Sequence, residues 1–359
     1  MRRFQGRFRW VVAGLVLSLA FLAPLQAQNN YAGSFLELGI GARAIAMGGA
    51  FVAVADDGSS FYWNPAGVAT LVQPEVFGMY ASLYRSLSKH FHLGFTRPLS
   101  GRGAISLNWI RLTVPNVAQY DSENLIRYGP NGYENRLFES TQAETWQELQ
   151  ALGTVLTDPA SGFSSFTNDA FIFTLAKLNK LDVDFGWQYF VLPVTMPIGI
   201  NVKIIRQSLF QHSSSGIGFD LGWMLKFGID DLFDDSRLGK LSFGLAVKDI
   251  FNTKITWNTD SRHSDRIPRT WYLGTSYLQP LTKYNSRLLF SYTYQDRYGK
   301  SHHYSMEYVY FNRLAIRFGI DAGDFTAGVG MKVSLFQIDY AYKNHELGGS
   351  HRISTSIRL

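Results

Sequence analysis

The stretch 335–343 reads Leu-Phe-Gln-Ile-Asp-Tyr-Ala-Tyr-Lys, and large apolar residues alternate in it with polar or small ones. Large apolar side chains occupy every second position: Phe336, Ile338, Tyr340 and Tyr342. Because successive side chains of a β-strand point to opposite faces, this order predicts a strand with one apolar face and one polar or small face. The same alternation recurs in three neighbouring segments: 302–310, 313–321 and 324–333.

Segments of about ten alternating residues are typical of transmembrane β-barrels, which in bacteria have an even number of strands. Fourteen such segments are expected here: 76–84, 89–98, 103–111, 169–178, 195–206, 215–227, 240–250, 269–278, 286–295, 302–310, 313–321, 324–333, 335–343 and 350–359. The stretch 182–190 is either a further strand or an insertion. With the first strand running outward, short turns face the periplasm and longer loops face outside: 112–168, 251–268 and 344–349.

The first residues predict export. Four arginines (Arg2, Arg3, Arg7 and Arg9) precede an apolar stretch from Trp10 to Leu25, and Ala27 ends a suitable cleavage site. This layout is that of a signal peptide spanning 1–27. Its removal takes four positive charges and lowers the formal net charge from +6 to +2, so the charge gives no support to nucleic-acid binding.

The composition of the remaining chain favours a membrane barrel. There is no cysteine, which excludes disulfides, thiol nucleophiles and thiolate metal sites. Aromatic residues make up 15% of the chain and charged residues only 17%. No later segment has 18 consecutive apolar residues, so the predicted fold class is all-β: a transmembrane antiparallel up-and-down β-barrel in the bacterial outer membrane.

A soluble β-sandwich needs a polar outer face, and the faces opposite the apolar ones are small instead. They carry nine glycines: Gly94, Gly199, Gly218, Gly222, Gly244, Gly274, Gly319, Gly328 and Gly330. In a barrel these residues line the lumen and leave space inside it. Residues 31–75 do not alternate and are rich in small residues. Residues 28–75 are therefore expected to fill that space, and 76–359 to form the barrel.

Two motifs in this N-terminal segment carry a family resemblance. Gly41-Ala42-Arg43-Ala44 through Met47-Gly48-Gly49-Ala50, with Trp63-Asn64-Pro65-Ala66, resembles PorV/PorQ-type outer-membrane proteins, which are similar to FadL-like fatty-acid channels. The C-terminal run Asp339-Tyr340-Ala341-Tyr342 with Ser350-His351-Arg352 also looks like this family. The chain departs from the pattern at Leu359, where such barrels often end in Phe, and in two apparent insertions, 112–168 and 179–194.

The resemblance implies a fourteen-stranded barrel plugged by an N-terminal hatch. The hatch motif then comprises Gly41, Arg43, Met47, Gly48, Gly49, Asp56, Asp57, Asn64, Pro65 and Ala66. Some relatives act in type IX secretion, whereas FadL-like members pass hydrophobic molecules inward. Two functions therefore stay open: a scaffold that engages exported proteins or secretion-system components, and a conduit for a hydrophobic small molecule. Both have membrane lipid as a partner.

The sequence contains no catalytic motif, so no enzyme activity, catalytic residue, cofactor or metal is predicted. The lumen-facing charges have mixed signs: Lys203, Asp220, Arg317, Asp339 and Arg352. Paired charges that hold a plug explain them better than a selectivity filter of one sign. His90 and His92 share one strand face and are read as a polar lumen pair. The acidic 228–239 segment is read as a solvated turn. Within 112–168, Thr141 and Glu144 predict a short helix.

Overall fold

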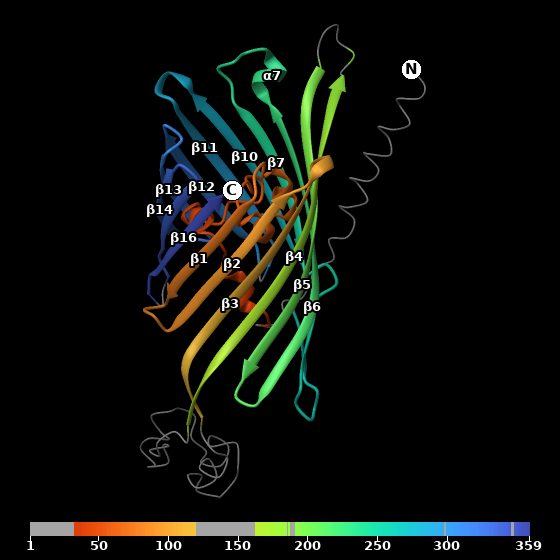
Figure 1. Ribbon diagram of the computed structural model, residues 1–359, viewed down its shortest axis with the longest axis vertical. Helices are drawn as coiled ribbons and strands as arrows, with labels where there is room; N and C mark the ends of the chain where they lie inside the picture. The colour runs from red at the N-terminus through yellow and green to blue at the C-terminus, as the bar shows by residue number, and fades with distance from the viewer. Residues whose placement is uncertain (1–31, 120–161, 185, 187–190, 298, 346–347) are drawn as a thin grey trace, which may run out of the picture. The chain divides into compact units, whose positions relative to one another are not determined.

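The computed structural model describes residues 32–119, 162–184, 186, 191–297, 299–345 and 348–359. The predicted signal peptide and the predicted helix after Thr141 lie outside these residues. Within them, fourteen antiparallel strands form one closed wall, because β5 pairs with both β4 and β6 (Figure 1). None of the described helices has the length and apolar character needed to cross a membrane.

Each wall strand coincides with a predicted alternating segment. The wall consists of β1 (Glu75–Leu83), β2 (Ser88–Pro98), β3 (Gly103–Gln119), β4 (Gly162–Asp184), β5 (Val191–Leu209), β6 (His212–Gly228), β7 (Lys240–Lys248), β10 (Thr270–Leu281), β11 (Ser286–Gln295), β12 (Ser301–Tyr310), β13 (Leu314–Asp321), β14 (Asp324–Val333), β15 (Phe336–Lys343) and β16 (Ser350–Arg358). The predicted all-β barrel and its strand number are thus confirmed.

Two predicted loop boundaries are wrong. The ladder between β3 and β4 continues to the pair Gln119–Gly162, so 112–119 and 162–168 are strand, while residues 120–161 of the predicted loop lie outside the described residues. The register shifts between Val114 and Val117, where Pro115 has no N–H to donate. Likewise, most of 179–194 extends β4 and β5, which pair out to Asp184–Val191. Residues 182–184, at the start of the stretch 182–190, thus belong to β4.

The predicted loop 251–268 also contains structure. It holds two short strands, β8 (Lys254–Trp257) and β9 (Ser264–Arg266), which extend the sheet from β6. Ile255 and Ile267 from this hairpin are buried. Ile267 lies against Gly33, so the hairpin folds over the start of the described N-terminal segment.

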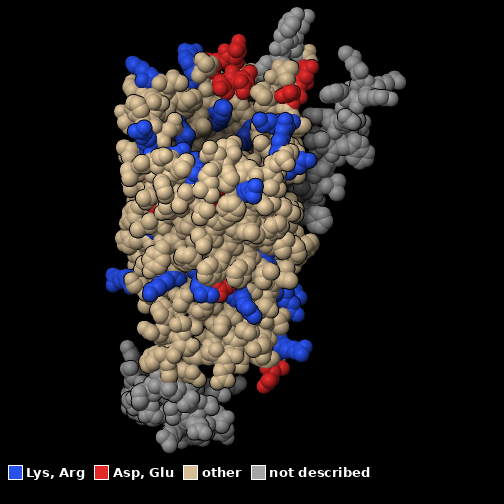
Figure 2. Space-filling view, in the orientation of Figure 1, with Lys and Arg blue, Asp and Glu red and all other residues tan. Residues whose placement is uncertain are grey.

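The outer face of the wall is apolar. Along β13, for example, Leu314, Ile316, Phe318 and Ile320 are all about half exposed, whereas the residues between them point inward. Figure 2 shows the result as a broad uncharged region between zones of basic side chains. Exposure of so many large apolar side chains is stable only in lipid. The chain is therefore an outer-membrane β-barrel.

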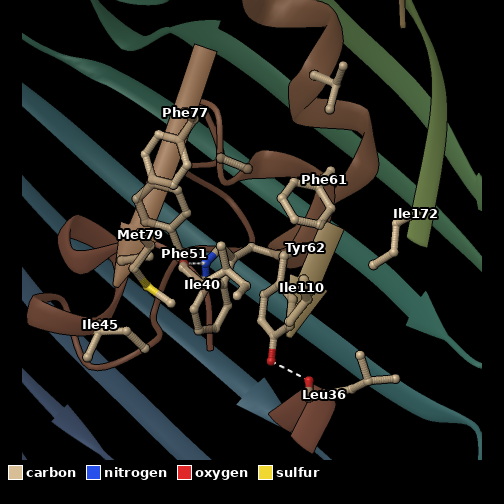
Figure 3. Packing of buried hydrophobic residues seen from close by; sticks show 14 of the residues in the cluster. Leu36, Ile40, Ile45, Phe51, Phe61, Tyr62, Phe77, Met79, Ile110 and Ile172 are labelled. Atoms are coloured by element: carbon tan, nitrogen blue, oxygen red, sulfur yellow. Dashed lines mark hydrogen bonds between the residues drawn. The ribbon is translucent and has the colours of Figure 1, made fainter. Parts of the chain in front are cut away.

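Residues 32–74, called the hatch below, lie against the inner face of the wall. The hatch contains η1 (Ser34–Glu37), α2 (Ala42–Ala46), α3 (Ser60–Trp63) and η2 (Pro65–Thr70). Helix α2 packs on β13–β16 and η2 packs on β3–β6, on opposite parts of the wall. Figure 3 shows hatch side chains such as Ile40, Phe51 and Phe61 packed with Ile110 and Ile172 of the wall. The main apolar core thus lies between hatch and wall.

Candidate functional site

The Asn-Pro-Ala element of the hatch rests on two wall glycines. Gly199 of β5 and Gly222 of β6 are paired in register and point inward. A Cβ on Gly199 would lie 2.4 Å from the carbonyl carbon of Pro65, and one on Gly222 would lie 2.2 Å from Asn64 Oδ1. Glycine is required at both positions because the hatch backbone occupies the space of a side chain.

The Asn64 side chain joins this element to the wall and to the rest of the hatch. It is fully buried. Its amide nitrogen donates to the carbonyl oxygens of Val52, at 2.9 Å, and Trp223, at 3.1 Å, while its oxygen accepts from the Ala66 N–H at 3.1 Å. Because a buried amide left without partners is unfavourable, this network holds η2 against β6.

The glycine-rich part of the motif makes a second close approach. Gly48 and Gly49 have φ of 59° and 72°, in the left-handed region, and Gly48 lies directly on the backbone of Ile320. From the wall side, a Cβ on Gly319 would lie 2.5 Å from the carbonyl carbon of Met47, which is itself fully buried. Gly41 (φ 88°) likewise adopts a conformation that glycine favours.

Arg43 is the charged centre of the hatch. Its guanidinium contacts Asp56 at 2.5 Å and Asp57 at 3.2 Å, both in the hatch, and Glu307 of β12 at 2.8 Å. A second bond to Glu307, at 3.0 Å, makes that contact bidentate. The wall continues the chain of charges, because Arg317 lies 2.6 Å from Glu307 and 2.7 Å from Asp339.

The charge states in the hatch follow from this arrangement. Burial disfavours the Arg43 cation, but Asp56 and Glu307 outweigh that effect and hold the pKa of Arg43 well above its usual value. Burial raises the pKa of the Asp57 carboxyl despite the neighbouring Arg43. Asp57 also accepts hydrogen bonds from the backbone and the hydroxyl of Ser59, which fixes the turn before α3.

A second charge cluster lies on the other side of the lumen. Lys203 of β5 contacts Asp220 at 2.7 Å and Asp249 at 2.8 Å, and all three are buried. Asn201, next to Lys203 on the same inner face, donates to the Phe61 carbonyl of the hatch at 2.8 Å. Lys248 lies 3.8 Å from the ring centre of Tyr62. These two contacts, a neutral hydrogen bond and a cation–π contact, hold the hatch on this side.

Arg352 is the last of the predicted lumen charges, and it contacts the hatch backbone instead of a wall carboxylate. Its guanidinium donates to the carbonyl oxygens of Leu38 and Gly39 in the hatch. Further strands contribute single bonds of the same type: His303 contacts the Gly48 oxygen at 3.0 Å and Thr326 donates to the Ala46 oxygen at 3.0 Å. Wall side chains therefore satisfy much of the hatch backbone, as buried carbonyls require.

Several of these partners were not among the predicted site residues. Glu307 has an inward position in an alternating strand, so the sequence could have predicted it as a lumen residue. The sequence around Glu307 does not indicate that Arg43 is its partner. Asp249 follows the last residue of β7 and has no such pattern. The structure brings Arg43, Arg317 and Asp339 into one cluster, Lys203 and Asp220 into another, and leaves Arg352 apart from both.

Two cavities of about 450 and 510 Å³ lie beside the Arg43 cluster and share four lining residues: Arg43, Asp56, Arg287 and Glu307. Together they are called the chamber. The hatch also contributes Ala53, Val54 and Thr70, and the wall contributes residues near the turn ends of its strands, including Arg313, Lys332 and Lys240. The chamber thus opens at the end that carries the tight β12–β13 and β14–β15 turns.

His90 and His92, which share an inward strand face, are both buried. His92 hydrogen-bonds Asn108 at 3.1 Å and stacks on Phe61, with ring centres 5.1 Å apart. Among the described residues, no group of three or more His, Asp or Glu side chains is arranged to hold a metal ion. The acidic segment after β6 contains the short helix α7 (Ile229–Phe233), and its Asp235 pairs with Arg237 at 2.8 Å.

No known protein-family model matches the chain, and no curated protein matches it. Distant similarity to solved outer-membrane channels is found. A TodX deltaS2S3 mutant monoaromatic hydrocarbon channel is 10% identical with a TM-score of 0.45, covering 89% of this chain and 99% of that one. The Pseudomonas putida toluene transporter TodX is 10% identical (TM-score 0.44, 89% and 97% covered). A Pseudomonas aeruginosa FadL homologue is 10% identical (TM-score 0.40, 84% and 94% covered).

At these scores the similarity carries no argument about what the chain binds. The finer assignment to the PorV/PorQ group, and the roles of the hatch motif residues, stay predictions.

Proposed function

We propose that this protein is a hatch-gated outer-membrane channel for small hydrophobic molecules, the role that its FadL-like hatch motif implies. One observation carries the proposal: the lumen is divided between the hatch and an open chamber. The chamber cavities, of about 450 and 510 Å³, are each within the usual range of small-molecule sites. A barrel that served only as a rigid scaffold would need no such space behind its plug.

The contacts between hatch and wall support a movable plug. They include close backbone contacts at wall glycines, apolar packing, single hydrogen bonds to hatch carbonyls and two ion pairs, that of Arg43 with Glu307 and that of Glu37 with Arg297. The hatch adds no strand to the wall, so its movement would break no wall ladder. The chamber lining is polar and charged on the side of Arg43 and Glu307, which suits a substrate with a polar group at one end.

A second candidate function, a plugged scaffold for exported proteins, has one observation in its favour. The hatch fills its part of the lumen with a continuous apolar core, in which Ile40, Phe51 and Phe61 are fully buried. A permanently sealed barrel would suit a protein that acts through its outer surface. The two functions predict different effects of losing the protein: loss of uptake for a channel and loss of protein export for a scaffold.

The test is a gene deletion with two readouts in the same strain. One readout is uptake of a labelled long-chain fatty acid, and the other is the set of proteins exported into the medium. The channel function predicts that uptake falls, that the wild-type gene restores it and that exported proteins are unchanged. If export stops while uptake continues, the scaffold function replaces the channel.

A further inference from the structure

A row of charged residues crosses the lipid-facing side of the wall. Arg111 of β3, Asp169 of β4 and Arg206 of β5 are consecutive partners in the strand register and point outward. Arg111 binds Asp169 through two bonds of 2.7 and 2.9 Å, and Trp109 Nε1 donates to the same carboxylate at 2.8 Å. The Arg111 guanidinium also lies 4.9 Å from the Trp109 ring centre. This arrangement fixes Arg111 in place.

The row has more positive than negative charge. The oxygens of Asp169 are occupied by Arg111 and Trp109, and the described part of the chain shows no ion pair for Arg206. Arg206 is exposed at the outer surface. Two guanidinium groups therefore flank one carboxylate, and the second donates no hydrogen bond to any residue that the structure describes. A guanidinium at the edge of a lipid-facing surface favours an anionic partner, because a charge near lipid is unfavourable without one.

An apolar groove begins next to this row. It has a volume of about 470 Å³ and is lined chiefly by outward side chains of β2 to β5: Leu93, Phe95, Leu107, Phe171, Phe173 and Ile204. Phe171 and Ile204 are the next outward residues after Asp169 and Arg206 along their strands. Figure 2 shows a row of basic side chains with one acidic patch at the margin of the uncharged region on this face.

We propose that this surface binds a phosphorylated lipid, with its phosphate on Arg206 and Arg111 and an acyl chain in the groove. A planar guanidinium binds phosphate oxygens through paired hydrogen bonds, and the second Arg is held ready by Asp169. The apolar groove begins at Phe171 and Ile204, the next outward residues after Asp169 and Arg206. An acyl chain can therefore contact the groove while its phosphate is bound. The site lies on the outside of the wall and is independent of the hatch and of the proposed channel function.

The test uses full-length protein purified in mild detergent. It is titrated with diphosphorylated lipid A and with lipid A stripped of its phosphates, and bound lipid is counted by native mass spectrometry. Arg206→Gln should weaken binding of the phosphorylated lipid at least about tenfold, the effect of losing a charged hydrogen-bonded contact. Arg206→Lys should fall between the wild type and Arg206→Gln, because lysine keeps the charge and loses the paired geometry.

Two matched variants distinguish a specific binding site from ordinary boundary lipid. Arg97→Gln removes an outward arginine of β2 near the opposite end of the apolar region and should leave binding unchanged. Leu107→Trp fills the groove with an apolar side chain and should weaken binding while keeping the barrel folded, as judged by its heat-dependent gel mobility. Equal binding of the dephosphorylated lipid, an equal loss in Arg97→Gln, or unchanged binding in Leu107→Trp would each overturn the proposal.

Discussion

The hatch meets the wall in two chemically different ways. Around Asn64-Pro65-Ala66 the contact is steric and neutral, because the hatch backbone lies on Gly199 and Gly222 and is held by amide hydrogen bonds. Around Arg43 the contact is electrostatic, through the bidentate pair with Glu307. The first contact determines where the hatch fits. The second holds it with a few charges, which makes it the better candidate for release.

The largest expected effect follows from removing the charged contact. Arg43→Met leaves Asp57 and Glu307 buried near one another without their shared cation, and Arg317 alone remains for Glu307. Loss of one partner of a buried ion pair costs about 3–5 kcal/mol, so the free energy of hatch opening should fall by about that amount. The measurement is the rate of proteolytic cleavage within residues 32–74 of the folded barrel.

The control for this variant is Arg97→Met, which removes an arginine from the outer face and should leave hatch cleavage unchanged. Equal cleavage of Arg43→Met and wild type would show that the ion pairs do not hold the hatch.

A smaller effect is expected from the steric contact. Gly222→Val places a side chain where Asn64 Oδ1 now lies, 2.2 Å from the new Cβ. Overpacking of this kind costs about 1–3 kcal/mol, so hatch cleavage should rise and the temperature of thermal unfolding should fall. Gly78→Val is the matched control, because the atom nearest to a Cβ at Gly78 is 3.7 Å away. A Gly222→Val protein as stable as Gly78→Val would contradict close packing of Asn64 on Gly222.

The smallest effect concerns the single hydrogen bonds from wall to hatch. Thr326→Val removes the 3.0 Å bond to the Ala46 carbonyl with little change of shape. The net loss of one neutral hydrogen bond is about 0.5–1.5 kcal/mol, and the same unfolding measurement resolves it. Thr355→Val, on the outer face of β16, should be neutral. If both variants behave alike, these bonds add nothing to hatch retention.

The wall could be predicted from sequence because alternation is a local property. The inward glycines were predicted for the same reason, and the structure confirms that Gly199, Gly222 and Gly319 face the lumen. Strand ends were harder to predict. Pro115 and Asn116 have the composition of a turn, yet β3 continues past them because β4 supplies partners as far as Gly162.

The candidate site could be predicted only in part. Small residues near Gly48 and the Asn64-Pro65 turn marked the hatch as a compact segment. The partners of that segment could not be predicted, since Arg43 and Glu307 are 264 residues apart in the chain. Which inward carboxylate meets Arg43 depends on closure of the whole barrel, and a local pattern holds no information on that.

In a hatch-gated channel, the hatch must move for a molecule to pass. Ala42 and Ser354 allow a direct test, because the Ala42 N–H donates to Ser354 Oγ at 3.2 Å and the chain has no native cysteine. A barrel carrying Ala42→Cys and Ser354→Cys can be locked by oxidation and released by reduction. Uptake of a labelled long-chain fatty acid should stop in the oxidised protein and return on reduction, whereas the single-cysteine variants should respond to neither. Equal uptake by the locked and released barrels would contradict hatch gating.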